Sequence, residues 1–337
     1  MAAGSTNRRS EGRVITVRGD VEPQALGAVL MHEHLYMSCR DWDEGPTPPE
    51  RAKLLMDYAV PNLRLLHDWS CHALVDATPI AWRAWPDTYV RIAEAADLHV
   101  ILATGFYREM EVGSYWVEDE RQAIWPRVRE STAEELADLC ISEITSGIHG
   151  TTVRAGAIKL GSSGRQLTEA EARAFRAGAI AQRLTAVPIT THCTAPGAHV
   201  TQLTALTDAG VDPARVMVGH TARHLVDETG SVRQWMERGA NFVPTNLRMD
   251  ENWEFWVDFV GVVRRLFDDG LGEHIMLGLD WAFETEQGPF VPCTFMPPPP
   301  FRYMFTHTLP RFRKLGLEES AIEQMMVANP ARVLPVQ

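Results

Sequence analysis

The chain of 337 residues lacks a long apolar run, and no stretch reaches the ~18 residues that a membrane-spanning helix needs. No block of Lys and Arg stands out, and 32 basic against 44 acidic residues give a net charge of −12. This charge argues against a nucleic-acid-binding protein and against one that binds an anionic membrane surface. Met1–Arg13 has an Arg8-Arg9 pair without an apolar segment behind it, so we interpret it as a flexible N-terminal tail rather than a signal peptide.

Cysteine is scarce, and its pattern excludes a disulfide framework. The five cysteines are Cys39, Cys71, Cys140, Cys193 and Cys293, an odd number, widely spaced and without a C-x-x-C motif. A chain of this length does not need disulfides to stabilise its core. We therefore expect reduced thiols and a cytoplasmic protein.

The hydrophobic pattern indicates the fold class. With 45% hydrophobic and 23% charged residues, the chain is neither disordered nor a coiled coil. Short apolar runs, nearly free of charge, alternate with longer amphipathic stretches, as expected for buried parallel strands joined by helices. The eight expected strands are Ala25–His32, His72–Thr78, His99–Thr104, Arg154–Leu160, Val187–His192, Arg215–His220, Asn241–Thr245 and His274–Asp280.

Helix signals lie between these runs. Ser131–Glu134 and Thr168–Glu171 have the capping-box spacing of a helix start. Glycines expected to end helices are Gly147, Gly210, Gly239 and Gly270. Eight strand–helix repeats without a break in composition predict an α/β fold, a single (β/α)8 TIM barrel over residues 14–337. The alternative, an open doubly wound sheet, lacks the expected G-x-G-x-x-G after the first strand.

Long loops are expected after strands three, seven and eight, where they would cap the active site. The first spans Phe106–Glu130, and the last spans Trp281–Pro300 and ends in four prolines. The loop after strand seven contains Trp253 and Trp256, whose i, i+3 spacing also suits packing of one helical face on the barrel.

Polar residues end five of the expected strands. They are His32, His34, Lys159, His192, His220 and Asp280. Residues i and i+2 share one face of a strand, so His32 and His34 point into the barrel mouth together. Each histidine alone has an ordinary alternative as a hydrogen-bonded strand-end residue. Lys159 can either form a salt bridge or, because burial lowers the pKa of its amine, react with CO₂ to form a carbamate.

Several motifs run in the order known from one enzyme family, over residues ~25–335. They are Leu30–Leu35, Ile158–Gly161, Thr191–His192, Val218–His220, Leu277–Asp280 and Ala328–Arg332. On these motifs the sequence resembles the phosphotriesterase-like branch of the amidohydrolase superfamily. The resemblance implies a binuclear metal-dependent hydrolase and, as is frequent in that family, a homodimer.

The resemblance also implies the roles of the ligands. His32, His34 and Asp280 would hold the more buried metal, and His192 and His220 the more exposed one. A carboxylated Lys159 and a hydroxide would bridge the two ions, which we expect to be zinc, with Mn, Fe or Co as substitutes. Such ions lower the pKa of bound water, and Asp280 would accept its proton and deliver it to the leaving group.

The sequence departs from the paraoxon-hydrolysing members after strand six. Those members have an aspartate three residues after the strand-six histidine, and a histidine after strand seven, as a proton relay. Here Arg223 takes the place of the acid, His224 follows it, and Pro244–Arg248 contains no histidine. The departure favours a bond other than a phosphotriester, although His224 could replace the relay.

Candidate substrate contacts follow the ligands in the chain. Tyr107 matches a lactonase tyrosine that contacts the bridging site, so the resemblance implies a catalytic residue there, with an ordinary loop aromatic as the alternative. Phe106 precedes it. Trp281 and Phe283 follow Asp280. Arg248 could bind a substrate carboxylate or phosphate, or pair with Asp250.

We therefore expect hydrolysis of a lactone, ester or amide in a small apolar or aromatic substrate. One alternative is an organophosphate or phosphodiester hydrolase with the same centre. The other is a barrel that binds a small molecule without turning it over.

Overall fold

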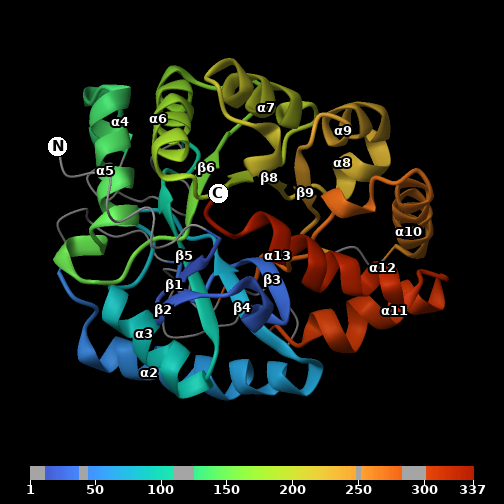
Figure 1. The fold of residues 1–337 in the computed structure, drawn as a ribbon, viewed down its shortest axis with the longest axis horizontal. Coiled ribbons are helices and arrows are strands. Elements are labelled where there is room, and N and C mark those ends of the chain that lie inside the picture. The colour runs from blue at the N-terminus through green and yellow to red at the C-terminus, as the bar shows by residue number, and fades with distance from the viewer. Residues whose placement is uncertain (1–11, 38–44, 110–124, 248–251, 283–300) are drawn as a thin grey trace.

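Seven parallel strands form a barrel with helices outside it (Figure 1). The computed structural model describes residues 12–37, 45–109, 125–247, 252–282 and 301–337. The strands pair in chain order: β3 (Ala28–Glu33), β4 (Cys71–Asp76), β5 (His99–Gly105), β6 (Ala157–Gly161), β7 (Ile189–His192), β8 (Val216–Gly219) and β9 (Asn241–Val243). Seven of the eight expected strands are thus confirmed, with boundaries shifted by a few residues.

The eighth expected strand is an extended segment rather than a regular strand. Parallel bridges join Ile275 to Phe242 and Ala282 to His34, so the segment fills the gap between β9 and β3. On the β3 side, the Met31 N–H donates to the Leu277 carbonyl at 2.9 Å. The chain therefore closes the barrel in the expected (β/α)8 order, but with an incomplete ladder at the last strand.

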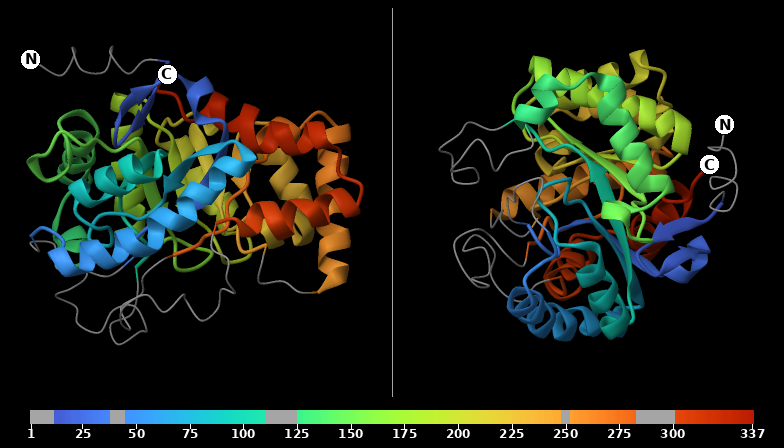
Figure 2. Two further views of the ribbon diagram at one scale, coloured as in Figure 1. Left: turned by 90° about the horizontal axis from the view of Figure 1, so that it is seen from below. Right: turned by 90° about the vertical axis from the view of Figure 1, so that its left-hand side faces the viewer.

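Helices surround the strands in all three views (Figures 1 and 2). The α-helices are α2 (Pro49–Arg64), α3 (Pro86–Ala96), α4 (Trp125–Glu130), α5 (Ala133–Thr145), α6 (Glu169–Thr185), α7 (Ala198–Asp208), α8 (Ala222–Asp227), α9 (Thr229–Met236), α10 (Trp253–Asp268), α11 (Leu309–Lys314), α12 (Glu319–Glu323) and α13 (Asn329–Val333). Short 3-10 segments are η1 (Pro23–Leu26), η2 (Leu65–Trp69), η4 (Ile148–Gly150), η5 (Pro213–Arg215) and η6 (Gly272–His274). Single π turns are η7 (Met304–Thr308) and η8 (Gln324–Ala328). Within the described residues, every helix is too short or too polar to cross a bilayer.

Local signals fix the helix ends. Thr168 caps α6 and forms the expected capping box with Glu171. The cap of α5 is Thr132 paired with Glu135, one residue later than expected from Ser131–Glu134. The expected terminal glycines have positive φ after the last turns of α5, α7, α9 and α10, a conformation that glycine adopts at little cost: Gly147, Gly210, Gly239 and Gly270.

A short antiparallel hairpin precedes the barrel. It consists of β1 (Val14–Thr16) and β2 (Gly19–Val21) and was absent from the expected strands. The Gly12 N–H donates to the Val336 carbonyl at 2.7 Å, and the Val336 N–H donates to the Arg13 carbonyl at 3.0 Å. The hairpin and the C-terminal segment therefore lie side by side.

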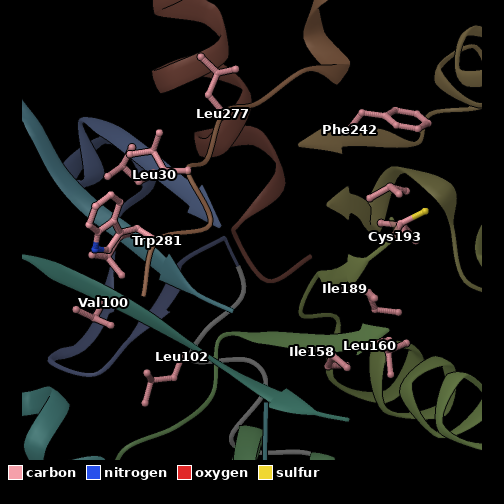
Figure 3. Close-up of a cluster of buried hydrophobic side chains, with 14 of the residues drawn as sticks. Leu30, Val100, Leu102, Ile158, Leu160, Ile189, Cys193, Phe242, Leu277 and Trp281 are labelled. Atoms are coloured by element: carbon pink, nitrogen blue, oxygen red, sulfur yellow. The ribbon is translucent and has the colours of Figure 1, made fainter. Parts of the chain in front are cut away.

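The apolar core has two layers because successive strand residues face opposite sides. The layer inside the barrel includes Val29, Met31 and Ala157. The layer between strands and helices includes Leu30, Ile158, Leu160 and Trp281, as Figure 3 shows.

The near-terminal Asn329 holds the irregular eighth segment in place. Its amide nitrogen donates to the Gly272 carbonyl at 2.9 Å and to the Ile275 carbonyl at 2.7 Å, and the side chain is buried. The next turn adds Arg332, which donates to the Glu273 carbonyl at 2.6 Å. These side-chain hydrogen bonds replace part of the backbone hydrogen bonding that the incomplete ladder lacks.

We predict that Asn329→Ala lowers the free energy of unfolding by about 1–3 kcal/mol, because two buried carbonyls lose their donor. Urea denaturation measures this. The matched control is Asn62→Ala on α2, where a half-buried amide donates to the Tyr58 carbonyl at 2.8 Å. Its effect should stay within about 0.5 kcal/mol. Equal losses in the two variants would contradict a special role for Asn329.

Candidate metal centre

The structure brings six polar side chains together at the carboxyl ends of the strands. They are His32, His34, Lys159, His192, His220 and Asp280. Lys159 and His32 are fully buried, and the Lys159 Nζ lies 2.8 Å from the His32 Nε2. Lys159 faces inward because its strand neighbours Ile158 and Leu160 pack outward against the helices.

Asp280 lies at the middle of the group. One carboxylate oxygen is 3.2 Å from the His34 Nε2 and 3.8 Å from the His32 Nε2. The other oxygen is 3.6 Å from the His220 Nδ1. Single ligand atoms of His32, His220 and Asp280 all lie within 4.8 Å of one another. One carboxylate therefore reaches three imidazoles, two at the end of β3 and one at the end of β8.

His192 extends the group on the side of Tyr107. Its ring centroid is 4.1 Å from that of His220 and 5.1 Å from that of Tyr107. The edge-to-face contact places the Tyr107 ring directly beside a candidate ligand. Burial raises the pKa of the Tyr107 phenol, so the hydroxyl stays protonated at neutral pH and can donate a hydrogen bond.

Three strand-end residues have left-handed backbones. They are His220, Asn246 and Asp280, with φ of 61°, 58° and 58°. Such conformations cost roughly 1–3 kcal/mol each and cluster at functional sites. Asn246 connects the other two, because its amide nitrogen lies 3.3 Å from the His220 Nδ1 and donates to the Asp280 Oδ2 at 3.3 Å.

Two buried carboxylates orient the ligands. Glu33 accepts the backbone N–H groups of Leu279 at 2.7 Å and Trp281 at 3.0 Å, one on each side of Asp280. On β4, Asp76 accepts the Leu35 N–H at 2.8 Å and the Thr78 N–H at 2.9 Å. The Thr78 hydroxyl lies 2.7 Å from the His34 Nδ1, which leaves the Nε2 to face Asp280.

Sequence reasoning did not identify these supporting residues or Asn246. Glu33 could have been identified from the sequence, because it lies between two candidate ligands in a strand that is buried on both faces. Asp76 could have been identified similarly, at the end of an apolar run. A buried carboxylate requires donors, and backbone N–H groups of the neighbouring strand end supply them.

Glycines make room for His32. A Cβ at Gly219 would lie 2.6 Å from the His32 ring, and one at Gly278 would lie 2.8 Å from the His32 Cβ. Both distances are shorter than side chains tolerate. This explains why glycine precedes His220 by one residue and Asp280 by two.

Burial sets the charge state of the group. It lowers the pKa of His32 and His192 well below the usual value, and that of His220 to about 4. Burial also lowers the pKa of Lys159 to about 7, against the opposing effect of the Asp280 and Asp76 charges. Neutral imidazoles with free lone pairs and one carboxylate are therefore available near neutral pH.

This donor set fits divalent metal ions. Imidazole nitrogens and carboxylate oxygens are the ligands that zinc and related ions prefer. Among the described residues, the buried His220 Nε2 has no hydrogen-bond partner. A cation supplies the missing partner for an inward-facing imidazole nitrogen.

The structure corrects two of the expected substrate contacts. Phe106 and Trp281 are both fully buried in the hydrophobic core, so they do not face a substrate. Trp281 packs among strand side chains in Figure 3. Arg248 and Phe283 lie outside the described residues.

A cavity of about 450 Å³ opens beside His220, and the described residues that line it are both polar and apolar. Thr194, Asn246 and Phe255 contribute to the wall. The exposed Arg223 lies on this wall with its guanidinium carbon 4.3 Å from the centre of the Phe255 ring. His224 also lines the cavity but is buried, and its Nε2 lies 3.1 Å from the Ala195 carbonyl oxygen.

Comparisons with known proteins agree with this geometry. The profile of the phosphotriesterase family matches residues 12–334. An aryldialkylphosphatase of Saccharolobus solfataricus is 23% identical, with 94% of this chain and 97% of that protein covered. The human N-acetyltaurine hydrolase is 24% identical, with 96% and 98% covered.

Solved structures extend the similarity to three dimensions. A mutant of a PTE-like lactonase from Deinococcus radiodurans superposes with a TM-score of 0.78 at 28% identity, covering 95% of this chain and 99% of its own. The aryldialkylphosphatase, the N-acetyltaurine hydrolase and the lactonase are all hydrolases, which favours an enzyme over a barrel without catalytic activity. The chain is a hydrolase and belongs to the phosphotriesterase family.

Proposed function

We propose that the chain is a binuclear metal-dependent hydrolase that cleaves a lactone, ester or amide bond of a small substrate. His32, His34 and Asp280 would hold one ion, and His192 and His220 the other. Two bound divalent ions, zinc in the first place, would lower the pKa of water and polarise the scissile carbonyl group. The remaining chemistry belongs to the side chains of the chain itself.

Asp280 is the proposed proton carrier. Its carboxylate lies between His34 and His220, and the Asn246 amide donates to one of its oxygens. Glu33 fixes the backbone on both sides of it. A carboxylate held in this way accepts a proton from the attacking water and returns it to the leaving oxygen or nitrogen.

Lys159 is the proposed bridging ligand after carboxylation. Its amine is fully buried with a pKa of about 7, so a large fraction is neutral at pH 7. The neutral amine adds to the carbon of CO₂ and releases one proton, which leaves an N-carboxylate. The new group carries a negative charge into a cluster whose only carboxylate among the six residues is that of Asp280.

The position of Tyr107 is one reason to propose a carboxyl-derived bond as the bond that is cleaved. Its ring lies against His192, where its protonated hydroxyl can position a substrate carbonyl. The exposed Arg223 stands where a relay acid would be, which supports a carboxyl-derived bond over a phosphotriester. The lactonase and N-acetyltaurine hydrolase similarities support the same choice.

The alternative is an organophosphate or phosphodiester hydrolase, which the aryldialkylphosphatase similarity favours. The burial of Phe106 and Trp281 removes two of the aromatic side chains on which the expectation of an apolar or aromatic substrate rested. We also propose a cytoplasmic location, supported by free, buried thiols at Cys71, Cys140 and Cys193.

Substrate panels test the bond type. We expect kcat/KM for lactones, carboxylic esters or N-acyl amides to exceed that for dialkyl aryl phosphates by at least about 100-fold, a difference of roughly 2.7 kcal/mol in transition-state stabilisation. The zinc-loaded protein is measured at one pH with matched leaving groups. A preference for the phosphates would favour the alternative.

Asp280→Asn should lower kcat by about 10²–10⁴-fold, because the amide cannot accept the proton. Circular dichroism and urea denaturation establish that the variant is folded. Asp258→Asn, at an exposed position of α10, is the control and should retain wild-type kcat. A wild-type kcat in Asp280→Asn would exclude the acid–base role.

Lys159→Ala should lose metal, measured as ions per chain by elemental analysis after desalting. A short carboxylic acid supplied with the metal should restore part of the activity, because it replaces the missing carboxylate. If the variant retains the wild-type metal content without the acid, the bridging role is wrong.

A further inference from the structure

A second cluster of metal-binding residue types lies away from the six-residue centre. His199 is in the first turn of α7, His224 is in α8, and Glu228 joins α8 to α9. Single ligand atoms of these three residues lie within 4.8 Å of one another. The three helices are neighbours at the upper right of the barrel in Figure 1. We call these three residues the His199 cluster.

Ser231 lies on one side of the His199 ring. Its hydroxyl oxygen is 2.9 Å from the His199 Nε2 and 3.1 Å from the Glu228 carbonyl oxygen. Burial, together with the nearby His224, lowers the pKa of His199 to about 4, so the ring is neutral at pH 7.

The other nitrogen of the His199 ring faces a carboxylate. The His199 Nδ1 lies 3.7 Å from the Glu228 Oε2, in a side chain that is 0% exposed. Among the described residues this nitrogen has no hydrogen-bond partner. A cation between this buried nitrogen and the Glu228 carboxylate would supply the partner that the nitrogen lacks.

His224 closes the cluster on its other side. Its Nε2 lies 4.0 Å from the Glu228 Oε1 and 3.8 Å from the Cys193 Sγ. The ring is 2% exposed, whereas the Glu228 side chain is 23% exposed and gives the cluster an opening to solvent. The same Nε2 donates to the Ala195 carbonyl oxygen at 3.1 Å, and on coordination its proton would move to the Nδ1, which has no hydrogen-bond partner among the described residues.

The separations suit coordination better than hydrogen bonding. Distances of 3.7 and 4.0 Å from nitrogen to oxygen exceed those of hydrogen bonds. Ligand atoms around a tetrahedral zinc lie roughly 3.4 Å apart, because Zn–N and Zn–O bonds are about 2.0–2.2 Å long. Each N–O separation exceeds this value by about 0.6 Å or less, and the two imidazole nitrogens, which lie within 4.8 Å of each other, would move together by up to about 1.4 Å.

Other contacts hold the ligands in place without the ion. The Gly197 N–H donates to the Glu228 Oε2 at 2.8 Å, just before α7 begins. Ser231 supports the far side of the His199 ring, as an outer partner supports a metal-bound histidine. The cluster thus has ligands, outer partners and a solvent opening.

We propose that the His199 cluster binds one divalent transition-metal ion, with zinc as the best fit, in addition to the ions of the His32–Asp280 centre. Two histidines and a glutamate form the ligand set. The ion would tie the start of α7 to α8 and to the start of α9. Because His224 lines the cavity beside His220, the ion would also stiffen one wall of that cavity. This proposal does not depend on the reaction catalysed.

Counting bound zinc tests it. Metal-free protein is saturated with zinc, desalted and analysed for ions per chain. Glu228→Gln should bind one ion fewer than the wild type, while its amide oxygen still accepts from Gly197. Glu237→Gln, at the exposed end of α9, is the matched control and should bind the wild-type number.

The same number of ions in Glu228→Gln and the wild type would overturn the proposal. The test reads a difference between variants, so a failure of the His32–Asp280 centre to bind two ions would leave it intact. The wild-type protein offers an independent measurement. Crystals grown with zinc should show an anomalous peak between the His199 Nδ1 and Glu228, and a water-sized peak without anomalous signal there would also overturn it.

Discussion

The buried carboxylate of Glu33 is the contact on which the site depends. It lies on β3 between His32 and His34, and it accepts the N–H groups on both sides of Asp280. One side chain thereby fixes the relative position of three candidate ligands from the two ends of the chain. It also supplies hydrogen bonds where the last strand lacks a regular ladder. Closure of the barrel and the placement of the ligands therefore depend on the same contact.

The sequence allowed the barrel and its ligand positions to be predicted because both follow local rules. Apolar runs marked the strands, and polar residues at their ends marked the site. The hairpin β1–β2 was missed because its strands have three residues each and Gly19-Asp20-Val21 resembles a turn. The irregularity of the eighth segment depends on Asn329 and Glu33, distant contacts that a pattern along the chain does not contain.

The substrate contacts were predicted less well, for a geometric reason. Trp281 was assigned to the substrate because it follows Asp280, yet neighbouring strand residues face opposite sides, and Asp280 itself has φ of 58°. The tryptophan therefore packs into the core. Phe106 is buried in the same layer, whereas Tyr107, one residue later, reaches His192. A position next to a ligand in the chain indicates that a residue lies near the site. The backbone conformation determines whether its side chain points into the site.

The pairing of Gly12 with Val336 determines where other groups can be attached to this protein. Arg215, the last residue of η5 and directly before β8, donates to the carbonyls of Val333 and Pro335 at 2.8 Å. The paired terminal segments therefore lie at the amino ends of the strands. The ligands lie at the opposite, carboxyl ends. A fusion partner, an affinity handle or a surface tether attached there would leave the mouth of the barrel open. Joining the paired segments by a short linker would allow a circular permutant of the protein. Its new termini could be placed in an outer helical connection.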